Sequence, residues 1–307
     1  MTLVPERPTP CIAVDGGASG CRLAAFDAAG DRLGTVRLDR HASLSLGPAE
    51  AARHVLEGLG RLRAATGIGP SAEVPLAFGL AGALRPDRCT SFREALPATL
   101  AVTALVTDGR AQLLGATGGG PGACLSIGTG SVLHWDAAGA VGMAGGWGFP
   151  VGDAGSAAWL GAALLRRYLR ERDRGRSAGE PLFADLEAVT GADVASLQEW
   201  TTCSVSTRVG SLATLVTAHA ERDHPIALAL LEEGVEHCLE LFDAAPAGLP
   251  RYLVGGLAPV YAPRLERRGV ALWAPRGDAL DGLARLARAG AGDGAAAGAL
   301  AVAGAAR

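Results

Sequence analysis

One succession of elements occurs twice in this chain: an apolar segment of strand length, a glycine-rich loop, a second strand and an Asp-Ala-Ala-Gly turn. The first copy has its loop in Asp15-Gly-Gly-Ala-Ser-Gly20 and its turn in Asp27-Ala-Ala-Gly30. The second copy has its loop in Gly128-Thr-Gly-Ser131 and its turn in Asp136-Ala-Ala-Gly139. Coincidence in a chain rich in alanine and glycine is the alternative, but two copies in the same order favour an internal duplication.

The glycines of both loops let backbone N–H groups approach an anion closely, because no Cβ stands in the way. Ser19 and Thr129 add hydroxyl groups that are suited to phosphate oxygens. Any single glycine of this kind is more often an ordinary turn, whereas the pair favours a polyphosphate held from two sides.

A second glycine-rich turn follows the later loop and contains Trp147 and Asp153. It predicts a polar pocket beside the phosphate loop. Trp147 either stacks on a sugar ring or fills the core. Asp153 either accepts sugar hydroxyl groups or caps the helix predicted from Ala157, and both roles are compatible.

The first half of the chain alternates strands with helices, and the second half is mainly helical. Strands are predicted at 11–14, 22–26, 32–38, 74–79, 102–107, 123–127, 132–135 and 251–254, with a further short strand ended by Trp273. Helices are predicted at 48–66, 87–96, 110–116, 157–171, 181–189, 193–201, 206–222 and 225–243, and from Asp278 onward. This succession predicts an α/β fold with a mixed sheet in each half. We expect one domain at 1–110 and another at 111–307, with the last helix (about 279–300) packing back on the first domain.

Composition excludes several classes of function. The net charge is −3 and no basic run is interleaved with aromatic residues, so nucleic acid is not an expected partner. The sequence contains no run of about 18 apolar residues, so no membrane span is predicted. The N-terminus has no apolar signal segment, and we therefore expect a cytoplasmic protein. The six cysteines and six histidines lack metal-ligand spacing, and we expect reduced, mostly buried thiols.

Two carboxylates follow predicted strands, at the edge where α/β folds place ligand and catalytic groups. Asp108 follows the strand at 102–107 and is either a general base for an attacking hydroxyl or the cap of the next helix. Asp15 ends the first strand and suits a magnesium ion held through water. Gly255-Gly256, after the strand at 251–254, either admits an adenine base or forms a plain turn.

The conspicuous motifs occur in a fixed order along the chain. They are Asp15-Gly-Gly-Ala-Ser-Gly-Cys-Arg22, Gly79-Leu-Ala-Gly-Ala83, Thr107-Asp108, Gly128-Thr-Gly-Ser131, Gly145-Gly-Trp-Gly-Phe-Pro-Val-Gly-Asp153 and Leu253-Val-Gly-Gly256. Over about residues 10–285 this order resembles the BadF/BadG/BcrA/BcrD-type ATPases of the actin/Hsp70/sugar-kinase superfamily, most closely their N-acetylglucosamine and glucosamine kinases. The resemblance implies two duplicated, actin-like domains of ribonuclease-H type, with ATP, Mg²⁺ and an amino sugar in the cleft between them.

The resemblance also implies a role for each motif. The first phosphate motif would contain Asp15, Gly16, Gly17 and Ser19, and the second Gly128, Thr129, Gly130 and Ser131. Asp108 would be the general base, Asp15 would hold Mg²⁺, and Gly255 and Gly256 would form the adenosine motif. The sugar would be bound by Ser43, Gly82, Gly146, Trp147 and Asp153.

Four residues depart from the family pattern. Two of these departures lie in the first motif, where Ala18 and Ser19 replace a glycine and a threonine. The third is Ser43, which stands where the kinases carry a sugar-binding Asn, and the fourth is Ala154, which replaces a Glu. The sequence therefore predicts a kinase acting on glucosamine or N-acetylglucosamine, at the 6-hydroxyl by resemblance, with exposed helices of the second half as a candidate homodimer face. The alternatives are an activator-type ATPase that serves a redox enzyme, and a sugar-binding regulator without catalysis.

Overall fold

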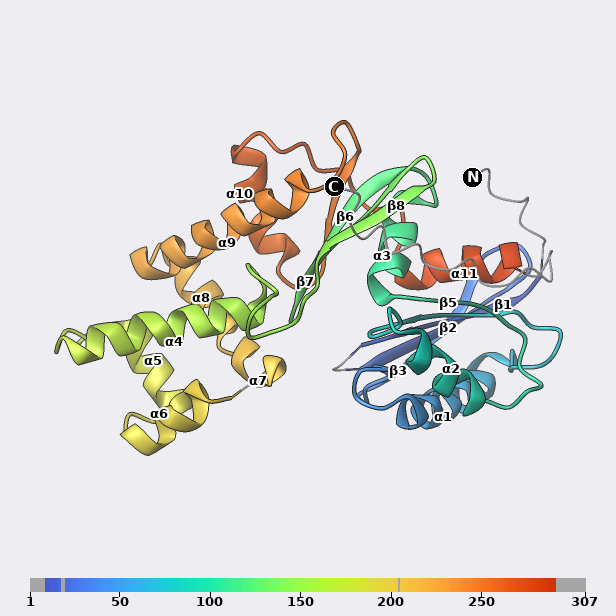
Figure 1. The fold of residues 1–307 in the computed structure, drawn as a ribbon, viewed down its shortest axis with the longest axis horizontal. Coiled ribbons are helices and arrows are strands. Elements are labelled where there is room, and N and C mark those ends of the chain that lie inside the picture. The colour runs from blue at the N-terminus through green and yellow to red at the C-terminus, as the bar shows by residue number, and fades with distance from the viewer. Residues whose placement is uncertain (1–8, 18–19, 204, 291–307) are drawn as a thin grey trace. The chain divides into compact units, whose positions relative to one another are not determined.

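A computed structural model describes residues 9–17, 20–203 and 205–290 (Figure 1). Contacts divide these residues into two compact units. The first contains the described residues up to Cys124, the segment His134–Gly142 and the described residues from Ala274 onward. The second contains Leu125–Leu133 and Met143–Trp273.

The first unit is built on a five-stranded sheet in the order β3-β2-β1-β4-β5. Its strands are β1 (Cys11–Gly16), β2 (Cys21–Phe26), β3 (Arg32–Leu38), β4 (Leu76–Leu80) and β5 (Val102–Val106). β2 pairs antiparallel with β1 and β3, while β4 pairs parallel with β1 and β5. The sheet is therefore mixed, as predicted.

Helices cover both faces of this sheet. Figure 1 shows α1 (Pro48–Thr66) and α2 (Pro86–Glu94) on one face and α3 (Asp108–Thr117) and α11 (Ala279–Gly290) on the other. Because side chains alternate along a strand, Ile12 and Val14 join the core under α1, whereas Cys11 and Ala13 join the core under α11. Burial on both faces explains why the first strand is apolar until Asp15.

The second sheet repeats the strand order of the first. Its order is β8-β7-β6-β9, with β6 (Gly122–Ile127), β7 (Ser131–Ala137), β8 (Ala140–Gly145) and β9 (Arg251–Val254). The two Asp-Ala-Ala-Gly turns also match: Asp27 Oδ1 accepts the Gly30 N–H at 2.9 Å, and Asp136 Oδ1 accepts the Gly139 N–H at 2.7 Å. The duplication predicted from the sequence is confirmed in strand order and in turn chemistry.

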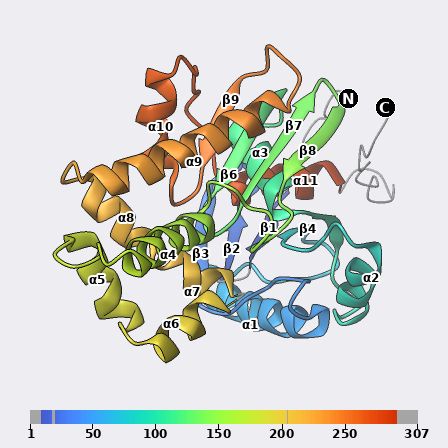
Figure 2. The ribbon, with the colours of Figure 1, turned by 60° about the vertical axis from the view of Figure 1, so that its left-hand side comes forward.

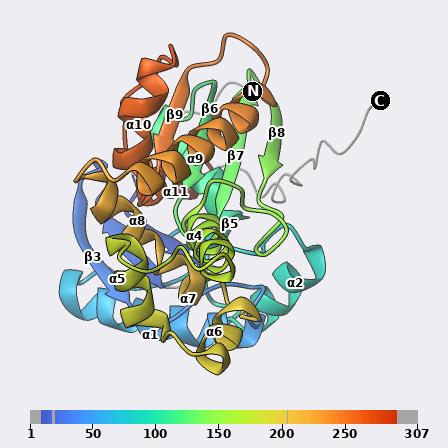
Figure 3. The same ribbon diagram turned by 90° about the vertical axis from the view of Figure 1, so that its left-hand side faces the viewer.

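The rest of the second unit is helical. It contains α4 (Ala157–Asp173), α5 (Pro181–Thr190), α6 (Val194–Thr201), α7 (Ser206–Gly210), α8 (Ala213–Ala220), α9 (Pro225–Asp243) and α10 (Ala258–Arg267). α4, α8 and α9 pack on one another (Figures 2 and 3). Within the described part of the chain, no helix has both the length and the apolar character needed to span a bilayer.

Several elements differ from the sequence prediction. The helix expected at 206–222 is two helices, because the Leu212 and Leu215 N–H groups bond three residues back and tighten the chain between α7 and α8. The glycine-rich β8 and the proline-containing α10 were not predicted, and the strand expected to end at Trp273 is a single bridge between Arg251 and Leu272.

The boundary predicted after residue 110 lies inside α3. α3 packs against α11 and β4, and these contacts place it in the first unit, which extends to Cys124. α11 also packs on β1, on the first sheet, where the last helix was expected. The remainder of that predicted helix, 291–300, lies outside the described residues.

Candidate active site

The first phosphate loop begins where β1 ends, at Asp15 and Gly16. The Gly17 N–H donates to the Gly20 carbonyl at 3.0 Å and closes the turn. A Cβ on Gly16 would lie 2.5 Å from Ala42 Cβ, so the backbone approach there requires glycine. The predicted phosphate ligand Ser19 lies outside the described residues.

Two further loops are hydrogen-bonded to this one. The Ala42 N–H donates to the Gly17 carbonyl at 3.1 Å, and the Ala81 N–H donates to the Gly16 carbonyl at 2.9 Å. These bonds bring the segments that contain Ser43 and Gly82 to the end of β1, beside the first phosphate loop.

Ser43 and Gly82 have structural tasks in these loops. Ser43 is 2% exposed, and its hydroxyl lies 3.4 Å from the Ala81 carbonyl and accepts the Ser45 N–H at 3.2 Å. Gly82 has φ +86°, and a Cβ there would lie 2.5 Å from Ser45 Oγ. The structure thus brings both residues to the loop cluster, while the Ser43 hydroxyl stabilises its own loop.

Asp15 is paired with Arg22, which stands opposite it in the β1–β2 register. Arg22 Nη2 donates to Asp15 Oδ2 at 2.5 Å, and the Asp15 side chain is 13% exposed. Burial raises the pKa of Asp15, and the Arg22 hydrogen bond opposes that rise without reversing it. Arg22 was not predicted as a site residue, although its place across the hairpin from Asp15 was a usable signal.

Asp108 is the first residue of α3 and does not cap it. The cap is Thr107, whose Oγ1 accepts the Arg110 N–H at 3.1 Å. Asp108 Oδ1 instead accepts the adjacent Gly109 N–H at 2.9 Å. The reading of Asp108 as the helix cap is therefore wrong, because the preceding threonine has that position.

The surroundings of Asp108 favour proton acceptance near neutral pH. Burial raises the pKa of Asp108 to about 6, and the nearby charge of Asp15 adds to the rise, while the Gly109 N–H opposes it. A carboxylate with a pKa just below the working pH is ionised and still basic enough to take a proton in a transition state.

His134 is a neighbour that sequence reasoning missed. It is buried, its Nε2 lies 3.3 Å from Thr107 Oγ1, and a Cβ on Gly109 would overlap its ring. Burial lowers the pKa of His134 to about 4, so the ring is neutral at physiological pH. This residue fixes the start of α3, and its position in β7 gave no sequence signal.

The second phosphate loop is held by the start of α4. The Gly128 and Thr129 carbonyls accept the Ala157 and Ala158 N–H groups at 2.8 and 3.2 Å. The Gly128 N–H donates to the Gly130 carbonyl at 2.9 Å. Ser131 is 3% exposed, and its hydroxyl donates to the Ala154 carbonyl, so it stabilises the loop from within.

Gly255 and Gly256 lie beside this loop, at the end of β6. The Leu257 N–H donates to the Ile127 carbonyl at 3.1 Å, and a Cβ on Gly255 (φ +106°) would overlap Ile127. Around a Cβ on Gly256, by contrast, no heavy atom lies within 4 Å. The predicted adenosine motif and the second phosphate motif are therefore brought together.

Asp153 organises the turn that precedes α4. It has φ +59°, its Oδ1 accepts the Gly148 N–H at 3.3 Å, and its Oδ2 lies 2.6 Å from the Cβ position of Gly130. Burial raises its pKa, and backbone N–H groups oppose the rise. The cap of α4 is Ser156, whose Oγ accepts the Trp159 N–H, so the reading of Asp153 as that cap is wrong.

Trp147 lies on the surface. Its side chain is 86% exposed, so the reading of Trp147 as a core residue is wrong. The preceding Gly146 has φ +70°, and a Cβ there would lie 2.9 Å from Val132. The glycine turn therefore presents an indole to solvent, next to the phosphate loop in the second unit.

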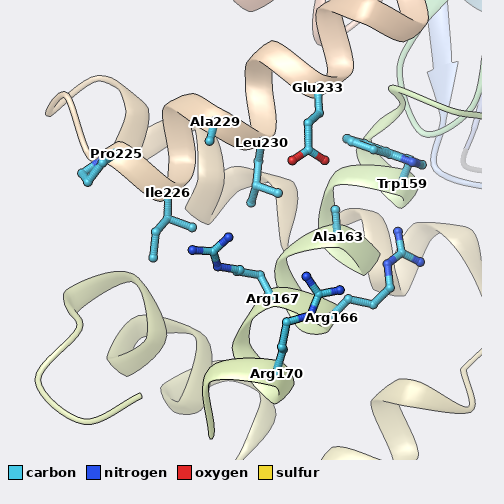
Figure 4. Close-up of a pocket in the computed structure, with 10 residues that line it drawn as sticks. All are labelled: Trp159, Ala163, Arg166, Arg167, Arg170, Pro225, Ile226, Ala229, Leu230 and Glu233. Carbon is cyan, nitrogen blue, oxygen red and sulfur yellow. The ribbon is translucent and has the colours of Figure 1, made fainter. Parts of the chain in front are cut away.

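A cavity of about 420 Å³ lies apart from these loops, between α4 and α9 of the second unit (Figure 4). Three arginines and Glu233 line it together with apolar residues. The arginines are Arg166, Arg167 and Arg170, all exposed, as expected for a solvated helix face.

Comparison with known proteins places these features in a family. The model of the BadF/BadG/BcrA/BcrD ATPase family matches residues 12–245. The glucosamine kinase GspK of Vibrio cholerae serotype O1 is 27% identical over 224 residues, which are 72% of this chain and 75% of that protein.

Two solved structures are also similar to this chain. A protein of Chromobacterium violaceum, described as a proposed N-acetylglucosamine kinase, is 31% identical, with a TM-score of 0.80 over 91% of this chain and 98% of its own. A protein of Porphyromonas gingivalis with the same description is 19% identical, with a TM-score of 0.70 over 90% of this chain and 98% of its own, and supports the fold alone.

Proposed function

Because this chain belongs to the BadF/BadG/BcrA/BcrD ATPase family, we propose that it is an ATP-dependent kinase that phosphorylates an amino sugar. The names of its relatives support glucosamine or N-acetylglucosamine as the acceptor. The observation that carries the proposal is Asp108, a carboxylate at the start of α3 that does not cap the helix and whose pKa burial raises to about 6.

In this proposal the two glycine loops hold the phosphates of ATP. No Cβ at Gly16, Gly17, Gly128 or Gly130 stands between the backbone and a phosphate. The N–H groups of Gly17 and Gly128 are used to close their own turns. The open space around Gly256 suits the adenine base. Thr129 adds a hydroxyl to the second loop.

Asp15 fits a magnesium ion held through water. Its Oδ2 is bound by Arg22, and among the described residues no hydrogen bond to its Oδ1 is found. One available carboxylate oxygen is what Mg²⁺ uses when it keeps most of its water shell. The bound ion would neutralise charge on the transferred phosphoryl group.

Asp108 would accept the proton of the sugar hydroxyl, at C6 by family resemblance, as that oxygen bonds to the γ-phosphorus. The bond from phosphorus to the ADP oxygen breaks, and ADP carries away the electron pair. Burial is the main cause of the raised pKa of Asp108, and the nearby negative charge of Asp15 adds to it, since both favour protonation.

The sugar would lie against the turns that contain Gly82 and Gly146. Asp153 offers a carboxylate to sugar hydroxyl groups, and the exposed Trp147 ring offers a stacking face. Ser43, the replacement for the sugar-binding Asn, is buried and would act on the sugar through the shape of its loop.

The cysteines favour a kinase over an activator ATPase with an iron–sulfur cluster. Cluster ligation by two copies of a chain requires accessible thiolates. Four of the six cysteines are buried, and burial raises the pKa of Cys21 and of Cys238 to about 12. The four buried thiols are core residues, and the other two, Cys89 and Cys203, are partly buried.

A coupled ADP-release assay tests the proposal. Glucosamine, N-acetylglucosamine, N-acetylmuramic acid and glucose are offered in turn to the enzyme with Mg-ATP. We expect ADP release that depends on an amino sugar, with a phosphorylated sugar as product. ADP release at the same rate with every sugar and with none would contradict the kinase proposal and favour an activator ATPase, while sugar binding without ADP release would favour a regulator.

A further inference from the structure

Three side chains outside the proposed active site converge where the loop after β3 meets α1. His41 Nε2 lies 3.4 Å from Glu50 Oε2, and His54 Nε2 lies 3.8 Å from Glu50 Oε1. One ligand atom from each of the three lies within 4.8 Å of the others. Glu50 and His54 are one helical turn apart on α1, so they project from the same face.

Hydrogen bonding fixes the tautomer of His54. Its Nδ1 lies 2.7 Å from the His41 carbonyl, which can only accept, so Nδ1 carries a proton and the neutral ring has its lone pair on Nε2. The ring is 4% exposed, and its lone pair faces Glu50. A histidine that donates from one nitrogen to a backbone carbonyl and presents the other as a bare donor atom has the arrangement of a metal ligand.

His41 can adjust to an ion. Its Nδ1 is buried and finds no hydrogen-bond partner among the described residues, so no bond seen at that nitrogen restrains the ring. The rings of His41 and His54 are in edge contact, with centroids 5.1 Å apart. In a tetrahedral zinc site with bonds of about 2.0–2.1 Å, ligand atoms are about 3.3 Å apart. The His41–Glu50 separation of 3.4 Å already matches this spacing, and the His54–Glu50 separation of 3.8 Å would shorten on binding.

We propose that His41, His54 and Glu50 form a binding site for a transition-metal ion, with zinc as the best match. Two imidazole nitrogens and one carboxylate favour zinc or cobalt over magnesium, which prefers oxygen ligands. Arg53 Nη2 donates to Glu50 Oε1 at 3.1 Å and would yield that oxygen to the metal.

The ion would join the loop to α1 and thereby steady the first phosphate loop. His41 precedes Ala42, whose N–H donates to the Gly17 carbonyl, and Ser43 follows. A metal bond at His41 would restrict this segment, while Glu50 and His54 are anchored in a helix of the same unit. The site would thus stabilise the fold near the loops without touching substrate.

Cobalt binding to the metal-stripped, untagged protein tests the site directly. Co²⁺ in a site of two imidazoles and a carboxylate gives visible absorption without the sulfur-to-metal band that thiolate ligands would produce. We expect binding of one equivalent. His41→Ala and Glu50→Gln should weaken it by about tenfold or more, since each removes one of three ligands. Glu57→Gln, two turns beyond Glu50 on α1, is the matched control and should bind as the parent does.

Two outcomes would overturn the proposal: no binding of Co²⁺ at one equivalent, or binding that is unchanged in both His41→Ala and Glu50→Gln. A second measurement guards against misfolding, because both replaced side chains reach the surface and the far-ultraviolet circular dichroism of the variants should match the parent. Zinc should raise the melting temperature of the parent and of Glu57→Gln but not of His41→Ala, and an equal rise in all three would also refute the site. None of these readouts depends on kinase activity.

Discussion

Two helices of the first unit, α3 and α11, have an aspartate at their start, Asp108 as the first residue of α3 and Asp278 just before α11, and the contacts of the two carboxylates differ. Asp278 precedes α11, and its Oδ1 accepts the Leu280 and Asp281 N–H groups at 3.0 and 3.2 Å. Arg32 Nη2 also donates to it at 2.7 Å. At α3 a threonine takes the capping position, and Asp108 Oδ1 accepts the adjacent Gly109 N–H.

The pKa values follow from these contacts. Burial raises the pKa of Asp278, but the Arg32 guanidinium and the Asp281 N–H outweigh burial and hold the pKa below its ordinary value. Burial raises the pKa of Asp108 to about 6, with no arginine to oppose it. Asp278 is therefore structural because it caps its helix, whereas Asp108 is available for chemistry because the neighbouring Thr107 caps α3.

The largest expected effect is on turnover. Asp108→Asn should lower kcat by about 10²–10⁴-fold, because the amide cannot accept the proton of the sugar hydroxyl. Asp278→Asn is the matched control and should retain kcat within about threefold, since Asn also caps helices. The measurement is sugar-dependent ADP release. Full activity in Asp108→Asn would remove the proposed difference between the two aspartates.

The pH dependence sharpens the same comparison. A general base works only when ionised, so kcat/KM should fall about tenfold per pH unit below about pH 6, the pKa of Asp108. The residual activity of Asp108→Asn should lack this acid limb, whereas Asp278→Asn should keep it. An acid limb that persists unchanged in Asp108→Asn would assign the ionisation to another group.

Asp108→Asn should raise the free energy of unfolding at pH 8 although it lowers activity. Its folded pKa is about 6, above the ordinary value of 3.8, so its stabilising contribution is present below pH 3.8 and is lost as the pH rises through 6. Asp108→Asn cannot ionise, and at pH 8 it should be more stable by on the order of 1–3 kcal/mol. Denaturant unfolding at pH 8 and pH 4 checks this, and a gain of equal size at both pH values would be inconsistent with ionisation as its cause.

The smallest effect is expected at α11, where the replacement should lower the free energy of unfolding. Asp278→Ala removes the cap and the partly exposed Arg32 pair, and should lower stability by about 1–2 kcal/mol at pH 7. Thermal unfolding beside the parent measures the loss, with kcat as the accompanying control. A stabilised Asp278→Ala would mean that burial, and not capping, dominates at this helix as well.

Much of the fold followed from local sequence pattern. The repeated Asp-Ala-Ala-Gly turns predicted the duplication, because an aspartate that accepts the N–H three residues on makes the same turn in both copies. α10 escaped prediction because Pro263 lies inside it and argues against a helix, whereas Pro259, in the first turn, is compatible with one. The burial of Tyr261 and Leu265 favours the helix in spite of Pro263.

The candidate site was also predicted only in part from the sequence. The glycines at 16, 128 and 255 were found because strand ends followed by glycine are a local signal. The pairing of Asp15 with Arg22, the position of His134 and the approach of His41 to Glu50 depend on strand register and on contacts between distant segments, which no local window contains.

Local sequence pattern predicted most of the strands and helices, with β8 and α10 as exceptions, and it identified residues able to bind phosphate or move a proton, since propensity and side-chain chemistry are local properties. The tertiary structure decides which of those residues are available for binding or catalysis. It buries Ser43 and Ser131, exposes Trp147, and gives the capping position of α3 to Thr107, so that Asp108 has no capping role. The physical reason is that burial and hydrogen-bond partners come from segments far apart in the chain, and these set the charge and the availability of each group.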